Sequence, residues 1–266
     1  MTEPVTTSTS RGHTLQRSYD LVVVGAGVSG SELAWAAARG GLDTLLVTTS
    51  MDTVYNLLGD GVVLRPPSGT LMAELHAQEA RGAGDSYNDS YNDSYSGGYV
   101  TTWGFHRRAK YALEHCPNLH LLQSNVSALI GESEARGVNT WEGVDRLGAR
   151  VALCVGSFLR ARLSIGTLTE AAGRLSEMAY DDLYDDLVAR GFAFEDERLE
   201  AAFDDGSLPY RVDCRRFALA EWDGEAFRLP RLAGLYAAGV CASGYLTYEE
   251  AAAQGRALAQ RIVSSG

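Results

Sequence analysis

The residues with the clearest chemical meaning form a glycine-rich turn with the spacing G-x-G-x-x-G. They are Gly25, Ala26, Gly27, Val28, Ser29 and Gly30. In such a turn the first glycine permits a tight bend, the second lets a pyrophosphate approach the backbone, and the third lets the next helix pack closely. The start of that helix offers free N–H groups and a partial positive charge. The motif therefore predicts a dinucleotide site.

A second group lies near the other end of the chain. Leu235–Gly239 reads as a strand with a glycine turn, and Tyr248–Gly255 as the start of an alanine-rich helix. Many flavoproteins close their FAD site with such a unit, because a helix N-terminus beside the flavin favours its anionic reduced form. We therefore expect Gly239 and Glu249 to contact FAD.

The first motif alone leaves NAD and FAD open. A dinucleotide fold usually ends its second strand with an acid that binds the ribose hydroxyls. Here the strand ends at Thr48 and Thr49, and no acid precedes Asp52. We expect these threonines, or backbone groups, to take the place of the acid.

Candidate catalytic groups are few. Cys241 follows the Gly239 turn and is a weak candidate for a redox-active thiol, whereas a packing role is the commoner one for such a cysteine. The His115, Cys116 and His120 spacing matches no common metal site, so we predict no metal. The catalytic residues thus stay unknown at this stage.

The elements that must position these residues follow a strand–helix–strand pattern. Tyr19–Val24 and Leu42–Thr48 are short apolar runs, and Glu32–Arg39 between them is rich in alanine and leucine. A crossover of this length requires parallel strands. The predicted fold class is α/β, a Rossmann-like FAD/NAD(P)-binding fold with a central parallel sheet, flanking helices and a small β insertion.

Further elements follow along the chain. The expected helices are Thr70–Arg81, Thr101–His115, Asp181–Arg190 and Tyr248–Val263, and the expected strands are Leu119–Gln123, Val126–Ile130, Gly137–Trp141, Arg150–Val155 and Gly234–Ala238. Residues 1–17 are expected to be a disordered polar tail and 18–266 a single FAD-binding domain. Within it, 82–98 carries an Asp-Ser-Tyr repeat that predicts a flexible loop. A tyrosine-lined lid is the alternative.

Composition limits the possible partners. The chain has 23 Lys and Arg against 34 Asp and Glu, a net charge of −11, which argues against direct nucleic-acid binding. The basic patch around His106 is expected to be a solvated helix face, with a phosphate contact as the alternative. Neither a secretion signal nor a membrane-length apolar run is recognised. We therefore expect a cytoplasmic protein with free thiols.

The whole pattern resembles a shortened member of the GidA (MnmG) family, FAD proteins that modify wobble uridines in tRNA. The similarity is carried by Tyr19–Thr49, by the segment from Val155 to Gly166 and by Y-E-E-A-A-A-Q-G at 248–255. The resemblance implies that Val126, Gly156, Ser176 and Val240 occupy FAD-contacting positions. It also explains the missing acid, since the family's second strand ends without one.

The sequence departs from this family in two ways. The family's nucleophilic cysteine, which would lie shortly after Asp52, is not found there, and we expect no helical tRNA-binding region. We therefore predict an FAD-dependent oxidoreductase of unknown substrate, with NAD(P)H as a candidate reductant and an oligomer as a candidate assembly. The alternative is a non-catalytic FAD-binding module or partner in a tRNA-modification complex. An NAD-linked dehydrogenase would leave the C-terminal motif unexplained.

Overall fold

The computed structural model describes residues 17–82, 99–202 and 208–265. The expected tail therefore lies outside the described residues except for Arg17, which forms an ion pair with Asp43 at 2.9 Å. The predicted repeat loop also lies outside them, apart from Gly82 at the end of a helix.

The centre of the molecule is a five-stranded sheet in which every neighbouring pair is parallel. In spatial order its strands are β17 (Leu235–Ala237), β10 (Val151–Leu153), β2 (Leu21–Val24), β3 (Thr44–Thr48) and β6 (Leu119–Gln123). The three inner strands are buried at almost every position, as short apolar runs in parallel sheets usually are. The predicted fold class is confirmed.

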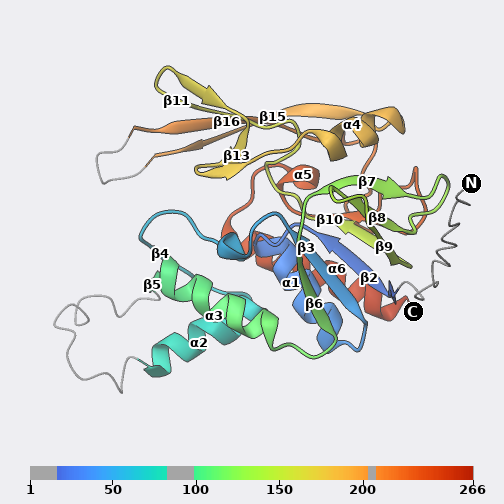
Figure 1. The fold of residues 1–266 in the computed structure, drawn as a ribbon. Coiled ribbons are helices and arrows are strands. Elements are labelled where there is room, and N and C mark those ends of the chain that lie inside the picture. The colour runs from blue at the N-terminus through green and yellow to red at the C-terminus, as the bar shows by residue number, and fades with distance from the viewer. Residues whose placement is uncertain (1–16, 83–98, 203–207, 266) are drawn as a thin grey trace, which may run out of the picture.

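The crossover helix α1 (Val28–Arg39) joins β2 to β3. It begins four residues before the expected start at Glu32. Gly27 is its N-cap in extended conformation, so the glycine turn itself forms the entry to the helix. Figure 1 shows α1 lying against the strands of the central sheet with α6 (Tyr248–Ser264) beside it.

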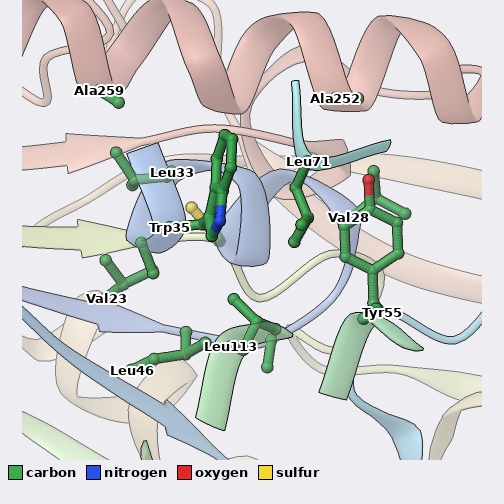
Figure 2. Packing of buried hydrophobic residues seen from close by; sticks show 14 of the residues in the cluster. Val23, Val28, Leu33, Trp35, Leu46, Tyr55, Leu71, Leu113, Ala252 and Ala259 are labelled. Atoms are coloured by element: carbon green, nitrogen blue, oxygen red, sulfur yellow. The ribbon is translucent and has the colours of Figure 1, made fainter. Parts of the chain in front are cut away.

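Alternate side chains of the inner strands enter two separate cores. Val23 and Leu46 belong to the core shared with the helices, whereas Val22 and Leu45 belong to the core on the opposite face. Figure 2 shows Leu33 of α1 among the helix-side residues. Because strand side chains alternate between faces, these short strands supply both layers.

Helices α1 and α6 pack in close contact at a glycine. A Cβ atom on Gly255 would overlap the carbonyl oxygen of Ser29 and lie 2.9 Å from Cβ of Glu32. The glycine therefore brings the C-terminal helix against the start of the first helix. In this way the two ends of the chain meet beside one sheet.

Two further layers are made of β structure. The first is a four-stranded sheet of β1 (Ser18–Tyr19), β9 (Asp145–Gly148), β8 (Gly137–Thr140) and β7 (Val126–Ile130). The second contains β12 (Leu168–Glu170), β11 (Arg162–Ile165), β16 (Tyr210–Phe217) and β15 (Phe194–Ala201). The sequence did not predict β15 and β16, because their many charged side chains obscure the apolar alternation.

The remaining elements are shorter connections and covering helices. They are η1 (Met51–Thr53), β4 (Gly61–Val63), α2 (Leu71–Gly82), β5 (Tyr99–Thr101), α3 (Thr102–Glu114), β13 (Ala172–Arg174), β14 (Glu177–Met178), α4 (Asp182–Ala189) and α5 (Val240–Ser243). The predicted helices agree with α2, α3, α4 and α6 to within a residue or two at each end. In the part of the chain that the structure describes, no helix is long and apolar enough to cross a membrane.

Candidate functional site

A cleft of about 540 Å³ runs along the carboxyl ends of β2, β3 and β10. Open α/β sheets bind ligands at this edge. The predicted cofactor residues that line the cleft are Gly25, Ala26, Gly27, Val28, Ser29, Thr48, Thr49, Val126, Gly156, Gly239, Val240 and Glu249. Gly30 and Ser176 are not among the lining residues. The structure thus brings both ends of the chain to one cavity.

The three glycines of the turn meet different surroundings. Gly25 has φ +101°, and a Cβ there would overlap the carbonyl oxygen of Cys154. A Cβ on Gly30 would overlap the carbonyl oxygen of Gly25, so Gly30 keeps the helix close to the turn. A Cβ on Gly27 would meet no atom within 4 Å. The open space beside Gly27 is where a pyrophosphate would approach the backbone.

The first turn of α1 faces this space. Because its N-cap is Gly27, no side chain caps the first amides of the helix. The bond from Ser31 N–H to Gly27 O marks the start of the helix. The preceding amides therefore have no intrahelical acceptor, and the helix dipole adds positive potential. The free amides and the positive potential at the start of α1 therefore fit a diphosphate.

The adenosine side of a dinucleotide fold lies at the end of the second strand, here β3. Thr48 donates its hydroxyl to Ser50 O at 3.2 Å. Ser124 follows β6, donates its N–H to Thr48 O at 2.8 Å and lines the cleft. Its hydroxyl donates to Glu142 at 2.6 Å, which lowers the pKa of that carboxyl. Sequence reasoning missed Ser124, which no motif marks.

At the other end of the cleft, α6 begins with a capping box. The Thr247 hydroxyl accepts from Glu250 N–H at 3.2 Å, and the Glu250 carboxylate accepts from Thr247 N–H at 2.9 Å. The Glu249 carboxylate accepts from Arg65 N–H at 2.9 Å. The Tyr248 hydroxyl accepts from Leu58 N–H at 2.8 Å. The helix therefore fastens the loop between η1 and β4 at Leu58 and the segment after β4 at Arg65.

The wall formed by β13 and β14 brings a charged pair that the sequence analysis did not single out. Arg174 and Glu177 line the cleft, with Nη1 3.5 Å from Oε1. Arg174 also donates to Asn56 O at 2.7 Å. Ser176 lies in the turn between these two strands, with φ +62°. Its predicted cofactor contact is therefore not supported by a place in the cleft wall.

The thiols are poorly placed for nucleophilic chemistry. Cys241 is 0% exposed, and its Sγ donates to Ala238 O at 3.4 Å. Burial raises its pKa to about 12. Cys154 lines the cleft, but burial raises its pKa well above the usual value. A thiol needs its thiolate form to react. Among the described residues, no cluster of His, Cys, Asp and Glu could hold a metal ion.

The basic patch on α3 is only partly a solvated face. His106 is buried, and its Nδ1 lies 2.6 Å from Val54 O. Lys110 lies 3.6 Å from the Asp52 carboxylate. The expectation of a fully solvated patch is therefore wrong for His106, because its ring fills a gap between α3 and the segment after η1.

A central parallel sheet, a glycine turn that opens a helix and a cleft at the sheet edge define an α/β protein with the Rossmann-like fold typical of dinucleotide-binding proteins. The model of the family described as glucose inhibited division protein A, GIDA, matches residues 20–205. The chain belongs to the GidA family.

Two curated relatives illustrate the sequence similarity. Each is described as tRNA uridine 5-carboxymethylaminomethyl modification enzyme MnmG. The one from Chlamydia caviae is 33% identical over 191 residues, and the one from Geobacter metallireducens is 31% identical over 192. Each alignment covers 66% of this chain. The chain spans only about a third of their length, 31% and 30% respectively.

Solved structures give a longer match. The GidA-related protein from Thermus thermophilus superposes with a TM-score of 0.79 at 36% identity, covering 94% of this chain and 100% of that one. GidA from Aquifex aeolicus has a TM-score of 0.72 at 15% identity, covering 92% of this chain and 63% of that one. At that identity the second match shows the fold alone.

Proposed function

We propose that the chain binds FAD in the cleft and acts as an FAD-dependent oxidoreductase. The observation that carries the proposal is the meeting of the glycine turn and the start of α6 at one cavity in a GidA-family chain. FAD would supply electron or hydride transfer when bound. The chain's own residues would bind the diphosphate at Gly27, contact the adenosine near Ser124, and orient the flavin beside Tyr248.

The substrate region would lie beside Arg174 and Glu177, which are half-buried at the cleft wall. Burial raises the pKa of Tyr210, which lines the same wall. Like any tyrosine it keeps its proton at neutral pH, and its hydroxyl would donate a hydrogen bond to a bound substrate. We propose a cytoplasmic protein that uses NADH or NADPH as the reductant.

Reconstitution tests this function directly. Purified protein incubated with FAD and passed over a desalting column should be yellow, with absorbance near about 370 and 450 nm as for any oxidised flavin. NAD should not compete for the same site. Protein that stays colourless after reconstitution would overturn the proposal, and tight NAD binding without flavin would support a dehydrogenase instead.

The second candidate function is a non-catalytic FAD-binding module, a partner in a tRNA-modification complex. It is favoured by the buried thiols at Cys154 and Cys241, and by the lack of a cysteine between Asp52 and Asp60. Stopped-flow mixing with NADH and NADPH separates the two. Rapid bleaching of the flavin absorbance supports the oxidoreductase, whereas bound FAD that is not reduced by either nucleotide supports the module.

A further inference from the structure

A buried carboxyl on α1 takes no part in lining the cleft. Glu32 is 0% exposed, yet three donors point at it. Its Oε1 accepts from the Tyr55 hydroxyl at 2.5 Å and from Met72 N–H at 2.8 Å, and its Oε2 accepts from Leu71 N–H at 2.7 Å. Burying a charged group is costly unless it is compensated, so a buried acid on the helix that starts at the glycine turn calls for a structural explanation.

These bonds connect three separate segments. Leu71 and Met72 open α2, so Glu32 caps that helix from outside and satisfies two of its first amides. Tyr55 donates its N–H to Ala26 O at 2.8 Å, which joins it to the glycine turn. Figure 2 shows Tyr55 and Leu71 on the same side of the core as Val28. Glu32 therefore lies where α1, α2 and the segment after η1 meet.

The segment held in this way forms part of the cleft. Thr53 and Leu58, on either side of Tyr55 along the chain, both line it. A change in the bonds around Glu32 would therefore move the cleft wall and the glycine turn together. We propose that Glu32 is a positioning residue for the cofactor, and that its protonation state sets the affinity of the cleft. This inference rests on the proposed binding of FAD.

The pKa of Glu32 gives the direction in which FAD affinity should change with pH. Burial raises the pKa of Glu32 from 4.5 to about 7, against the opposing effects of the Tyr55 bond, the Met72 and Leu71 amides and Arg256 on α6. Because the packed arrangement prefers the protonated acid, this group's contribution to stability is full below its ordinary pKa of 4.5 and is lost as the pH rises from 4.5 through about 7. A charged Glu32 would also repel an anionic diphosphate. Both effects predict tighter FAD binding at the lower pH.

Other charged and titratable groups also face this segment. His106 on α3 bonds to Val54 O, Arg174 donates to Asn56 O, and Glu177 accepts from the Asn56 amide. A variant that removes only the titration of Glu32 isolates its contribution. Glu32→Gln is of similar shape and stays neutral at every pH. Its amide can donate to the Tyr55 oxygen and its carbonyl can accept from Leu71 N–H, but Met72 N–H loses its acceptor, so the shape of the pH profile is the quantity to compare.

The experiment measures the dissociation constant of FAD for the apoprotein by flavin fluorescence, from about pH 6 to about pH 8.5. For the unmodified protein we expect binding at least about fivefold tighter at the acid end. Glu32→Gln should bind tightly at both ends, with a flat profile. Tyr55→Phe removes a donor that lowers the Glu32 pKa. The midpoint of the curve of FAD affinity against pH should therefore move to higher pH in this variant.

Glu74→Gln is the matched control. Glu74 lies on α2 and pairs with Arg39 at 2.7 Å, but its side chain is 47% exposed. It should keep the profile of the unmodified protein. A profile that persists in Glu32→Gln would overturn the inference. If the FAD affinity of the unmodified protein does not change with pH, or is higher at the alkaline end, the inference is also overturned.

Failure of the proposed function is distinguishable from failure of this inference. If the unmodified protein binds no FAD at any pH, the function fails. Amide hydrogen exchange of the apoprotein then decides the role of Glu32. Protection factors at Leu71 and Met72 should fall as the pH rises from 4.5 to the Glu32 pKa of about 7 in the unmodified protein, level off above it, and stay level throughout in Glu32→Gln. Equal pH profiles of these protection factors in both proteins would show that Glu32 does not control the packing at the start of α2.

Discussion

Gly27 and Gly30 stand close together in one turn, yet a methyl group at each would meet different surroundings. At Gly30 it would overlap the carbonyl oxygen of Gly25, whereas at Gly27 it would enter open space in the cleft. Gly27 has φ −68°, which any residue can adopt. At the scale of single residues, one glycine is therefore needed for the fold and the other for the ligand.

Two alanine substitutions test this distinction. Gly30→Ala should lower the free energy of unfolding by about 2 kcal/mol or more, because the backbone must move to accept the methyl group. Gly27→Ala should leave the unfolding free energy nearly unchanged and weaken FAD binding at least about tenfold, since its methyl group would occupy the space where the pyrophosphate approaches. Urea unfolding and FAD titration measure both quantities. Equal loss of stability in the two variants would contradict the assignment.

At the scale of elements, α6 has two tasks. It packs on α1 at Gly255, and its first turn forms one end of the cleft. The capping box of Thr247 and Glu250 sets where the helix begins. The Tyr248 side chain then holds the loop after η1 at the Leu58 amide, and the Glu249 side chain holds the segment after β4 at the Arg65 amide. The start of this helix therefore positions a wall that is distant in sequence.

Thr247→Ala tests the contribution of the cap. Removing the hydroxyl leaves Glu250 N–H without its side-chain acceptor, so we expect a loss of about 1 kcal/mol in the free energy of unfolding. Thr247→Ser keeps the hydroxyl and should be nearly neutral. Urea unfolding of both variants gives the comparison. A serine variant as unstable as the alanine variant would show that the methyl group matters more than the cap.

At the scale of the whole molecule, the net charge of −11 governs encounters with other polyanions. Several arginines of β15 and β16 are paired with acids and add little to a basic surface. Arg198 and Arg211 each contact the Asp213 carboxylate, at 2.7 and 2.9 Å. Arg216 contacts Glu195 and Glu197. Paired arginines of this kind offer little potential to a phosphate backbone.

We therefore predict that the isolated chain does not bind tRNA at physiological salt. A gel-shift titration at about 0.15 M salt should show no complex at micromolar protein, and lowering the salt should reveal only weak, salt-sensitive binding. A basic tRNA-binding protein run alongside confirms that the assay detects complexes. A salt-resistant complex would contradict the prediction.

Much of the fold could be predicted from the sequence, since the signals involved are local. The glycine spacing, the apolar runs of β2 and β3 and the alanine-rich α6 each depend on neighbouring residues, so their types and order were clear. The β15–β16 pair was not predicted, because its charged side chains are paired across two strands rather than along one. The true start of α1 depended on the conformation of Gly27.

The sequence by itself determined that a dinucleotide turn lies near the start of the chain and that a matching helix lies near its end. Only the tertiary structure decided which residues share the cleft. It brought Ser124 and Arg174 to the cavity walls, left Ser176 outside them and buried Cys241. It also placed the Glu32 carboxyl under three donors. Burial and hydrogen bonding between distant segments determine protonation and access, and neither is encoded in the spacing of residues along the chain.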